Sequence, residues 1–230
     1  MSSKSCAEID NVSSMGVDGI IFDLDGVLVD SMPTHFQAWK KAFAKITGLQ
    51  VTERDIYLLE GMRGVELVEK IFEQKNYSDH SAVRKVLDEK SRIFKSIRSS
   101  EPFEGVREMI SDLKCAKAVV SGSTRDDVET ILEEAFGKDK FDAVITADDI
   151  AKGKPDPSAF LEALERIKVM PEDAIVVENS PLGAKAANNA GILCYVALNN
   201  TPLDRSDFAG IISRERIFER TSQLREVLCK

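Results

Sequence analysis

The C-terminal half of the chain alternates between short apolar runs and longer amphipathic segments. Each run is continuous and too short for a helix, which is typical of strands buried on both faces of a parallel sheet. The runs are Ala118 to Val120, Ala143 to Ile145, Ala174 to Val177 and Leu193 to Ala197. The segments predicted as helices between and after them are Arg125 to Phe136, Ser158 to Ile167 and Leu182 to Ala190. The alternation predicts βαβ units, and therefore an α/β fold in which helices flank a parallel sheet.

The first part of the chain has a different pattern. Gly19 to Phe22 is another continuous apolar run and is predicted as a further strand. From Ser31 to Ser99, however, apolar residues recur at helical spacing and strand signals are almost absent. We therefore expect a flexible leader over 1–16, a Rossmann-like core formed by 17–30 and 101–230, and an inserted all-α helical cap over 31–100.

Local signals mark where two of the predicted helices begin. Pro157 follows Asp156 and Pro181 follows Ser180, and proline is favoured in the first helical turn behind a capping residue. Gly191 is expected to end the helix that Ser180 begins, since glycine adopts the left-handed conformation common just after a helix. These residues predict sharp strand-to-helix connections.

Composition excludes several classes of function. With 230 residues, 43% of them apolar, the chain can bury a full core, which excludes intrinsic disorder. The 31 basic and 39 acidic residues leave a net charge of −8, which disfavours nucleic acid or an anionic membrane as partner. No apolar run is long enough for a membrane span or a secretion signal. We expect a cytoplasmic protein, a monomer or weak homodimer, that binds a small molecule.

The four cysteines lie far apart, and the chain has only two histidines. This disfavours a disulfide framework, a multi-histidine metal site and a Ser-His-Asp triad. Carboxylates, lysines and hydroxyls are therefore expected to carry the chemistry.

Paired carboxylates follow the first predicted strand. Asp23 and Asp25, two residues apart in an extended chain, point to the same side. Paired negative charge beside a buried strand is costly unless a cation or a proton compensates it, and magnesium prefers oxygen ligands. The alternative is that both aspartates cap a turn at Gly26.

Three more polar segments follow predicted strands. Ser121 and Gly122 form a small turn that could hold a phosphate oxygen, or simply begin a helix. Lys154 precedes a proline, which favours an extended conformation, although a solvated loop lysine is the alternative. Glu178 and Asn179 offer two oxygen donors, or a helix cap. Because strand ends meet at one edge of a parallel sheet, these segments together predict a site for an anion and a metal.

Taken together, these motifs resemble those of the haloacid dehalogenase superfamily. Asp23 to Leu28 is similar to its first motif, Ser121 to the second, Lys154 to the third, and Glu178-Asn179 to the fourth. The predicted helical cap is similar to that of the subgroup containing β-phosphoglucomutase and many small-metabolite phosphatases. The resemblance covers the chain from about residue 17 to its end.

The resemblance implies a role for each motif residue. Asp23 would attack phosphorus and form an aspartyl phosphate, while Asp25 would act as general acid and then general base. Ser121, Gly122 and Lys154 would bind the phosphate. The metal, Mg²⁺, would be held by Asp23, the carbonyl of Asp25, and the oxygens of Glu178 and Asn179.

The fourth motif departs from the family pattern. Many relatives of this subgroup have Glu-Asp where this chain has Glu178-Asn179, so one negative charge is missing from the expected metal shell. An asparagine carbonyl can still bind magnesium, which predicts altered metal affinity and not inactivity.

Three cap residues are candidates for substrate contact. His35 and Lys90 are similar to a histidine and a lysine of the mutase cap, although a surface histidine and a solvated lysine are the alternatives. Arg63 could grip a second phosphate or a carboxylate, but its position is shifted by about one residue relative to the mutase.

Three hypotheses for function follow. The first is a magnesium-dependent phosphatase of a small phosphorylated metabolite. The second is a phosphomutase of the β-phosphoglucomutase kind, which passes the phosphoryl group between positions of a sugar phosphate. The third is a sensor of phosphorylated metabolites without catalytic activity, which the presence of Asp23, Asp25, Ser121 and Lys154 disfavours.

Overall fold

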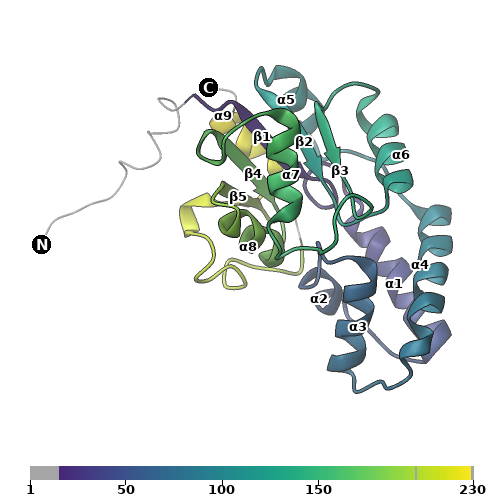
Figure 1. Ribbon diagram of the computed structural model, residues 1–230. Coiled ribbons are helices and arrows are strands. Elements are labelled where there is room, and N and C mark those ends of the chain that lie inside the picture. Colours follow the sequence, from purple (N-terminus) through teal and green to yellow (C-terminus); the bar gives the residue numbers. More distant parts are fainter. Residues whose placement is uncertain (1–15, 200, 229–230) are drawn as a thin grey trace, which may run out of the picture.

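A computed structural model describes residues 16–199 and 201–228. Of the predicted leader, residues 1–15 lie outside the described part of the chain. Figure 1 shows a sheet with helices on both sides and a separate group of helices packed against one end of it.

The core is built on a six-stranded parallel sheet with strand order β3-β2-β1-β4-β5-β6. The strands are β1 (Gly19–Asp23), β2 (Ala116–Val120), β3 (Ala143–Ile145), β4 (Ala174–Glu178), β5 (Leu193–Ala197) and β6 (Ile217–Phe218). Ile20, Ile21 and Phe22 of β1 are fully buried, because helices cover both faces of the sheet. This explains why the strands are continuously apolar.

Helices α5 (Val106–Asp112) and α6 (Arg125–Phe136) cover one face of the sheet, and α7 (Ser158–Ile167) and α8 (Pro181–Asn189) cover the other. Ile20 and Phe22 face the first pair, whereas Ile21 faces the second. The short helical segments of the core are 3-10 turns at Pro171–Asp173, Arg214–Arg216 and Thr221–Leu224, followed by α9 (Arg225–Leu228).

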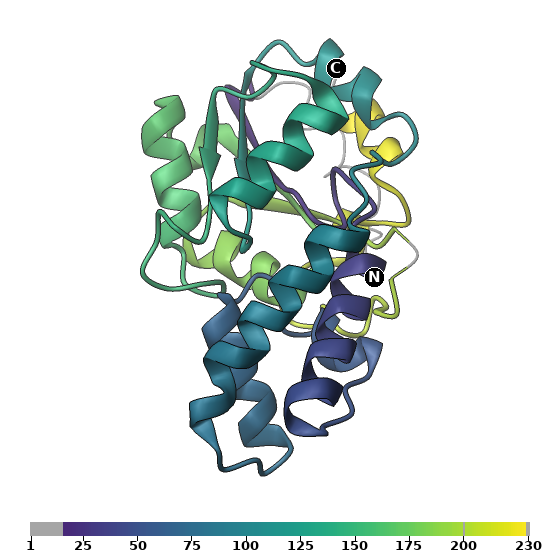
Figure 2. The same ribbon diagram turned by 90° about the vertical axis from the view of Figure 1, so that its right-hand side faces the viewer.

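The inserted segment is entirely helical. It contains α1 (Met32–Thr47), α2 (Glu53–Tyr57), α3 (Gly64–Gln74), a 3-10 turn at His80–Ala82, and α4 (Val83–Ile97). Helices α1 and α4 run alongside each other, as Figure 2 shows. Phe43 and Phe72 are fully buried between the cap helices, with ring centroids 6.3 Å apart. Both rings belong to the same hydrophobic cluster as Ile21 of β1 and Phe160 of α7, so the apolar packing of the cap continues into the core.

The predicted α/β fold with a helical cap is confirmed, with two local differences. The short edge strand β6 was not predicted, because two residues carry no usable periodicity. Pro157 is the N-cap of α7 and not its first residue, so the prediction for this helix start was wrong by one position. By contrast, Ser180 caps α8 through its side chain, which accepts a hydrogen bond from the amide of Gly183.

The sheet topology creates a cleft beside β1. The chain progresses from β1 to β2 and β3 on one side and then crosses to β4 on the other side of β1. In open α/β sheets, ligands bind at the carboxyl ends of strands where such a reversal occurs. Among the described residues, no helix is both long and apolar enough to cross a membrane.

Candidate active site

Strand register brings the predicted motif residues to one edge of the sheet. Asp23, the last residue of β1, is aligned with Val120 of β2, and Ser121 comes directly after it. Phe22 is aligned with Val177 of β4, so Asp23 and Glu178 leave the sheet side by side. All these side chains are buried.

Lys154 links the two central strands. It lies in the loop after β3, two strands away, and its Nζ donates to Oδ1 of Asp23 and, at 2.5 Å, to Oε1 of Glu178. Burial alone would lower the pKa of Lys154, but the two carboxylates raise it above its ordinary range. The lysine therefore remains charged.

Asp23 stands in a negatively charged environment. Burial is the main cause that raises its pKa to about 8, and the carboxylates of Glu178 and Asp25 add to this, while Lys154 acts in the opposite direction. A cation in the site would therefore stabilise the ionised, nucleophilic form of Asp23.

Asp25 is held by four side chains. Its Oδ1 accepts from Oγ of Ser31 at 2.5 Å and lies 3.1 Å from Nε2 of His35, and its Oδ2 accepts from Ser121 and Ser123 Oγ at 3.3 Å. Burial opposes ionisation, but His35 and the hydrogen bonds outweigh it and keep the pKa of Asp25 low. Sequence reasoning missed Ser31 and Ser123 as partners of Asp25, although both lie next to the motifs that it used.

The two residues of the fourth motif differ in their hydrogen bonding: the side-chain oxygens of Glu178 are bonded, and that of Asn179 is not. Oε2 of Glu178 accepts from the backbone amides of Asn179 and Ser180, at 3.0 and 3.1 Å, and from the Ser180 hydroxyl at 3.0 Å. With Lys154 on Oε1, both oxygens of Glu178 are engaged. Oδ1 of Asn179, in contrast, is one of three buried side-chain polar atoms without a hydrogen-bond partner among the described residues.

These residues fit a hard divalent cation. The candidate ligands are the carboxylate of Asp23, the main-chain carbonyl of Asp25 and the unpartnered Oδ1 of Asn179, all of them oxygen donors. Nowhere in the described chain do three or more His, Cys, Asp or Glu side chains gather into a metal-binding cluster. The candidate set does not need one, since two of its three donors are carbonyl oxygens.

The structure adds an acidic cap residue that sequence reasoning missed. Glu60, between α2 and α3, is only 9% exposed, and both of its carboxylate oxygens accept from Nδ2 of Asn179, at 3.0 and 2.9 Å. Burial is the largest cause that raises the pKa of Glu60 well above its usual range, followed by the nearby Asp23. No sequence signal marks this residue, because its contact depends on how the cap rests on the core.

The predicted cap residues have different surroundings. His35 of α1 is buried and stacks against Phe94, with ring centroids 4.1 Å apart. Lys90 of α4 lies over the rings of Trp39 and Phe94, with Nζ 5.3 and 4.5 Å from their centroids. Burial lowers the pKa of Lys90 to about 8. Burial and the charge of Lys90 also lower the pKa of His35.

Arg63 forms a hydrogen bond with the core. Its Nη1 donates to the carbonyl of Ala151, 2.8 Å away in the loop that carries Lys154. The arginine also lines the cavity described next.

A cavity of about 430 Å³ lies between the core and the cap, and the candidate catalytic residues form its floor. Its size suits a small metabolite. Its polar side chains are those of Asp23, Asp25, Ser123, Thr124, Asp127 and Asp148 from the core, and of His35, Glu60, Arg63, Arg84, Asp88, Lys90 and Ser91 from the cap, and Gly122 also lines it. Asp127 also presents a buried oxygen, Oδ1, without a partner.

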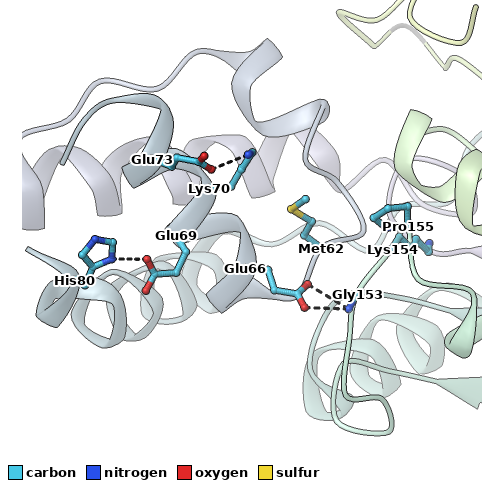
Figure 3. Close-up of a pocket in the computed structure, with 9 residues that line it drawn as sticks. All are labelled: Met62, Glu66, Glu69, Lys70, Glu73, His80, Gly153, Lys154 and Pro155. Carbon is cyan, nitrogen blue, oxygen red and sulfur yellow. Dashed lines mark hydrogen bonds and ion pairs between the residues drawn. The ribbon is translucent and has the colours of Figure 1, made fainter. Parts of the chain in front are cut away.

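A second cavity of about 480 Å³ lies along α3 on the outer side of the Lys154 loop. Figure 3 shows Glu66 reaching across it to the amide of Gly153, and the two are joined by hydrogen bonds of 3.2 and 3.3 Å. Farther along α3, Glu69 forms an ion pair with His80 of the following 3-10 turn. These acidic side chains hold the cap to the core or pair with neighbours, and the candidate catalytic residues Asp23 and Asp25 are absent from this lining.

The comparisons with known proteins agree with this arrangement. A family model for haloacid dehalogenase-like hydrolases matches residues 20–197, which is most of the chain. The chain therefore belongs to the family of haloacid dehalogenase-like hydrolases and is an enzyme.

Two curated relatives are phosphatases. The phosphorylated carbohydrates phosphatase of Thermotoga maritima is 33% identical over 182 residues, covering 76% of this chain and 82% of the relative. The fructose-1-phosphate phosphatase YqaB of Escherichia coli is 32% identical, covering 76% of this chain and 93% of the relative. A solved structure of β-phosphoglucomutase from Clostridium difficile has a TM-score of 0.76 and 25% identity, covering 90% of this chain and 93% of its own.

Proposed function

We propose that this enzyme is a magnesium-dependent phosphatase of small phosphorylated sugars or related metabolites, acting through an aspartyl phosphate. The observation that carries the proposal is the position of Asp23 and Asp25 on the floor of the cavity between core and cap, with Lys154 beside Asp23. Phosphoryl transfer depends mainly on positioning and on neutralising negative charge, and this site is built for both.

In the first step, an Asp23 carboxylate oxygen attacks phosphorus, and the bond from phosphorus to the leaving oxygen breaks. Asp25, which enters this step protonated even though the protein groups around it keep its pKa low, gives its proton to that oxygen, so the metabolite leaves as an alcohol. In the second step, Asp25 takes a proton from water, the water oxygen attacks phosphorus, and inorganic phosphate leaves. This second step restores the Asp23 carboxylate.

Cations and hydrogen-bond donors counter the negative charge of the carboxylates and the phosphate. Lys154 compensates Asp23 and Glu178 directly, as its contacts to both carboxylates support. Ser121 and the amide of Gly122 lie where they could bind phosphate oxygens. Bound at Asp23, the Asp25 carbonyl and Asn179, Mg²⁺ would supply further positive charge for the phosphoryl group.

The cavity and the relatives support the substrate class. The cavity has acidic, basic and hydroxyl groups on several sides, which suits a molecule that carries hydroxyl groups and a phosphate. Two relatives that are at least 32% identical carry the names of sugar phosphate phosphatases. The cap covers this cavity and would exclude bulk water during transfer.

A phosphomutase is the second candidate. The observations that favour it are the contact of His35 with Asp25 and the place of Lys90 in the cavity wall. Both residues are similar in sequence position to residues of the β-phosphoglucomutase cap, and a β-phosphoglucomutase is among the structural relatives. In such an enzyme the aspartyl phosphate passes to a second sugar phosphate and not to water.

Phosphorus NMR of the purified protein would separate these functions. The sample contains Mg²⁺, a pooled panel of sugar, glycolyl and nucleotide phosphates, and a trace of glucose 1,6-bisphosphate. Growth of inorganic phosphate at the expense of one compound is expected. Conversion of β-glucose 1-phosphate to glucose 6-phosphate with little free phosphate would establish the mutase instead. No turnover of any compound would contradict both and favour a sensor.

A further inference from the structure

One of the segments through which the cap contacts the catalytic core is the loop of residues 58–63, which we name the cap loop. The backbone amide of Lys154 donates to the carbonyl of Gly61 at 3.0 Å, and Arg63 donates to Ala151 at 2.8 Å. Gly61 has a φ of +90°, and a Cβ at this position would lie 2.5 Å from the Lys154 side chain. The loop is therefore closely fitted to the third motif.

The same loop contacts the fourth motif through Glu60. Its two carboxylate oxygens both accept from Nδ2 of Asn179, while Oδ1 of Asn179 has no partner. The two ends of an asparagine amide have opposite hydrogen-bonding roles, and in this structure both Glu60 oxygens accept from the amide, so neither donates to it. The Glu60 carboxylate therefore selects the orientation in which Nδ2 faces the cap and Oδ1 is left free.

This pairing also accounts for the departure from Glu-Asp in the fourth motif. An aspartate at position 179 would place a second carboxylate within about 3 Å of the Glu60 oxygens, where like charges repel strongly. Asparagine replaces that repulsion with a charge-assisted hydrogen bond between cap and core. The changed motif residue and the acidic cap residue are thus complementary.

We propose that Glu60 is a positioning residue that orients the Asn179 amide so that Oδ1 is available to a divalent cation. The inference rests on the magnesium site of the proposed function. Glu60 itself acts through Asn179, as groups behind a metal ligand commonly do, and losing such a partner typically lowers metal affinity by about 10- to 100-fold. Because Glu60 belongs to the cap, cap position and cation binding are coupled.

The test measures Mg²⁺ binding by calorimetry in the absence of any substrate. Glu60→Gln is examined in the natural background and in an Asn179→Asp background. In the natural background, a glutamine at position 60 can donate as well as accept, so the Asn179 amide can also turn its Oδ1 towards the cap. We therefore expect about a 10-fold loss of Mg²⁺ affinity. In the Asn179→Asp background the substitution relieves a repulsion, and we expect a change of less than about 2-fold.

The matched control is Glu66→Gln, which alters another carboxylate at the cap–core contact, one that accepts from Gly153 and not from Asn179. Its Mg²⁺ affinity should stay within about 2-fold of the unaltered protein. An equal loss for Glu60→Gln in both backgrounds would mean that Glu60 acts by its charge or binds the metal itself, and would overturn the proposal. No loss in either background would overturn it as well.

Hydrogen exchange gives a second measurement that needs no double variant. Mg²⁺ should slow amide exchange in the cap loop of the unaltered protein, because cation binding and the Glu60 contact support each other. This slowing should be absent in Glu60→Gln, and its persistence would contradict the proposed coupling. Neither measurement depends on turnover. If Glu60 affects Mg²⁺ binding as expected but the protein hydrolyses no phosphate ester, only the phosphatase proposal is refuted.

Discussion

Nε2 of His35 lies 3.1 Å from Oδ1 of Asp25, so a helix of the cap contacts the proposed general acid–base directly. The contact is buried, with both residues at most 7% exposed. His35 therefore influences the charge of Asp25 as well as its orientation, and the chemistry on the core depends on where the cap rests.

Replacing His35 should change the pH dependence of the reaction. The histidine and its hydrogen bond lower the pKa of Asp25 against the effect of burial, so in His35→Asn the pKa of Asp25 rises. Asp25 then keeps the proton that the first step requires to higher pH, so the limb of the kcat/KM profile that falls as Asp25 ionises moves upward. We also expect a loss of roughly 10-fold or more at neutral pH from poorer orientation.

The control for this variant is His80→Asn, which alters the other histidine, on the cap surface beside Glu69. Its pH profile should match that of the unaltered enzyme. A profile for His35→Asn without any shift would show that the histidine does not act on Asp25.

Asp23→Asn should abolish phosphate release and at the same time stabilise the metal-free protein. The pKa of Asp23 rises from 3.8 to about 8 in the fold, so the native state binds more protons than the unfolded state between these values. The free energy of unfolding of the natural protein therefore falls as pH rises through this window, and the variant escapes that fall.

Denaturant unfolding in EDTA at pH 5 and pH 8, together with a phosphate-release assay, checks both parts. Asp18→Asn, an exposed position just before β1, is the control. Undiminished phosphate release by Asp23→Asn would remove Asp23 as the nucleophile.

Lys154→Met should destabilise the fold by about 3–5 kcal/mol, because it leaves the buried carboxylates of Asp23 and Glu178 without their shared cation. Urea unfolding without metal at pH 9, where Asp23 is ionised because its pKa is about 8, measures this loss. The exposed Lys152→Met, two residues away, should change stability by less than about 0.5 kcal/mol. Equal stability of the two variants would mean that Lys154 is not a structural counter-ion.

Lys90 should make substrate affinity depend on pH above neutrality. Its pKa of about 8 means that the lysine is mostly charged at pH 7 and mostly neutral at pH 9, so the KM for a sugar phosphate should rise between these values. In Lys90→Met the KM should be high and independent of pH over this range.

The exposed Lys95→Met, whose lysine pairs with Asp126 at 2.7 Å, is the control for Lys90. Lys90→Ala should also impair isomerisation of a sugar phosphate more than hydrolysis of an aryl phosphate, if the mutase activity is present. Equal losses on both would remove the role of Lys90 in substrate selection.

Much of the core could be predicted from local pattern. The strands predicted near residues 118, 143, 174 and 193 and the helices between them are present, because continuous apolar runs and helical periodicity reflect burial directly. The motif residues Asp23, Ser121, Lys154 and Glu178 meet because parallel strands end at the same edge. The edge strand β6 was missed because two residues have no periodicity to detect.

Glu60 and Ser31 could not be predicted as parts of the site. Glu60 lies 119 residues from Asn179 along the chain, and an acidic side chain between two cap helices is normally solvated. Ser31 precedes α1 like an ordinary capping residue, yet its hydroxyl donates to Asp25. The Glu60 contact exists only because the cap is folded back over the end of the sheet, whereas the Ser31 contact depends on how the chain turns in the six residues after Asp25.

Hydrophobic period and chain direction are local properties, so the layered core, the helical cap and the group of residues at the strand ends can be predicted from the amino-acid order alone. How each side chain is paired depends on tertiary packing. It placed Lys154 between Asp23 and Glu178, and it set Glu60 against Asn179. Such pairings arise from the packing of segments far apart in the chain, which no local pattern records.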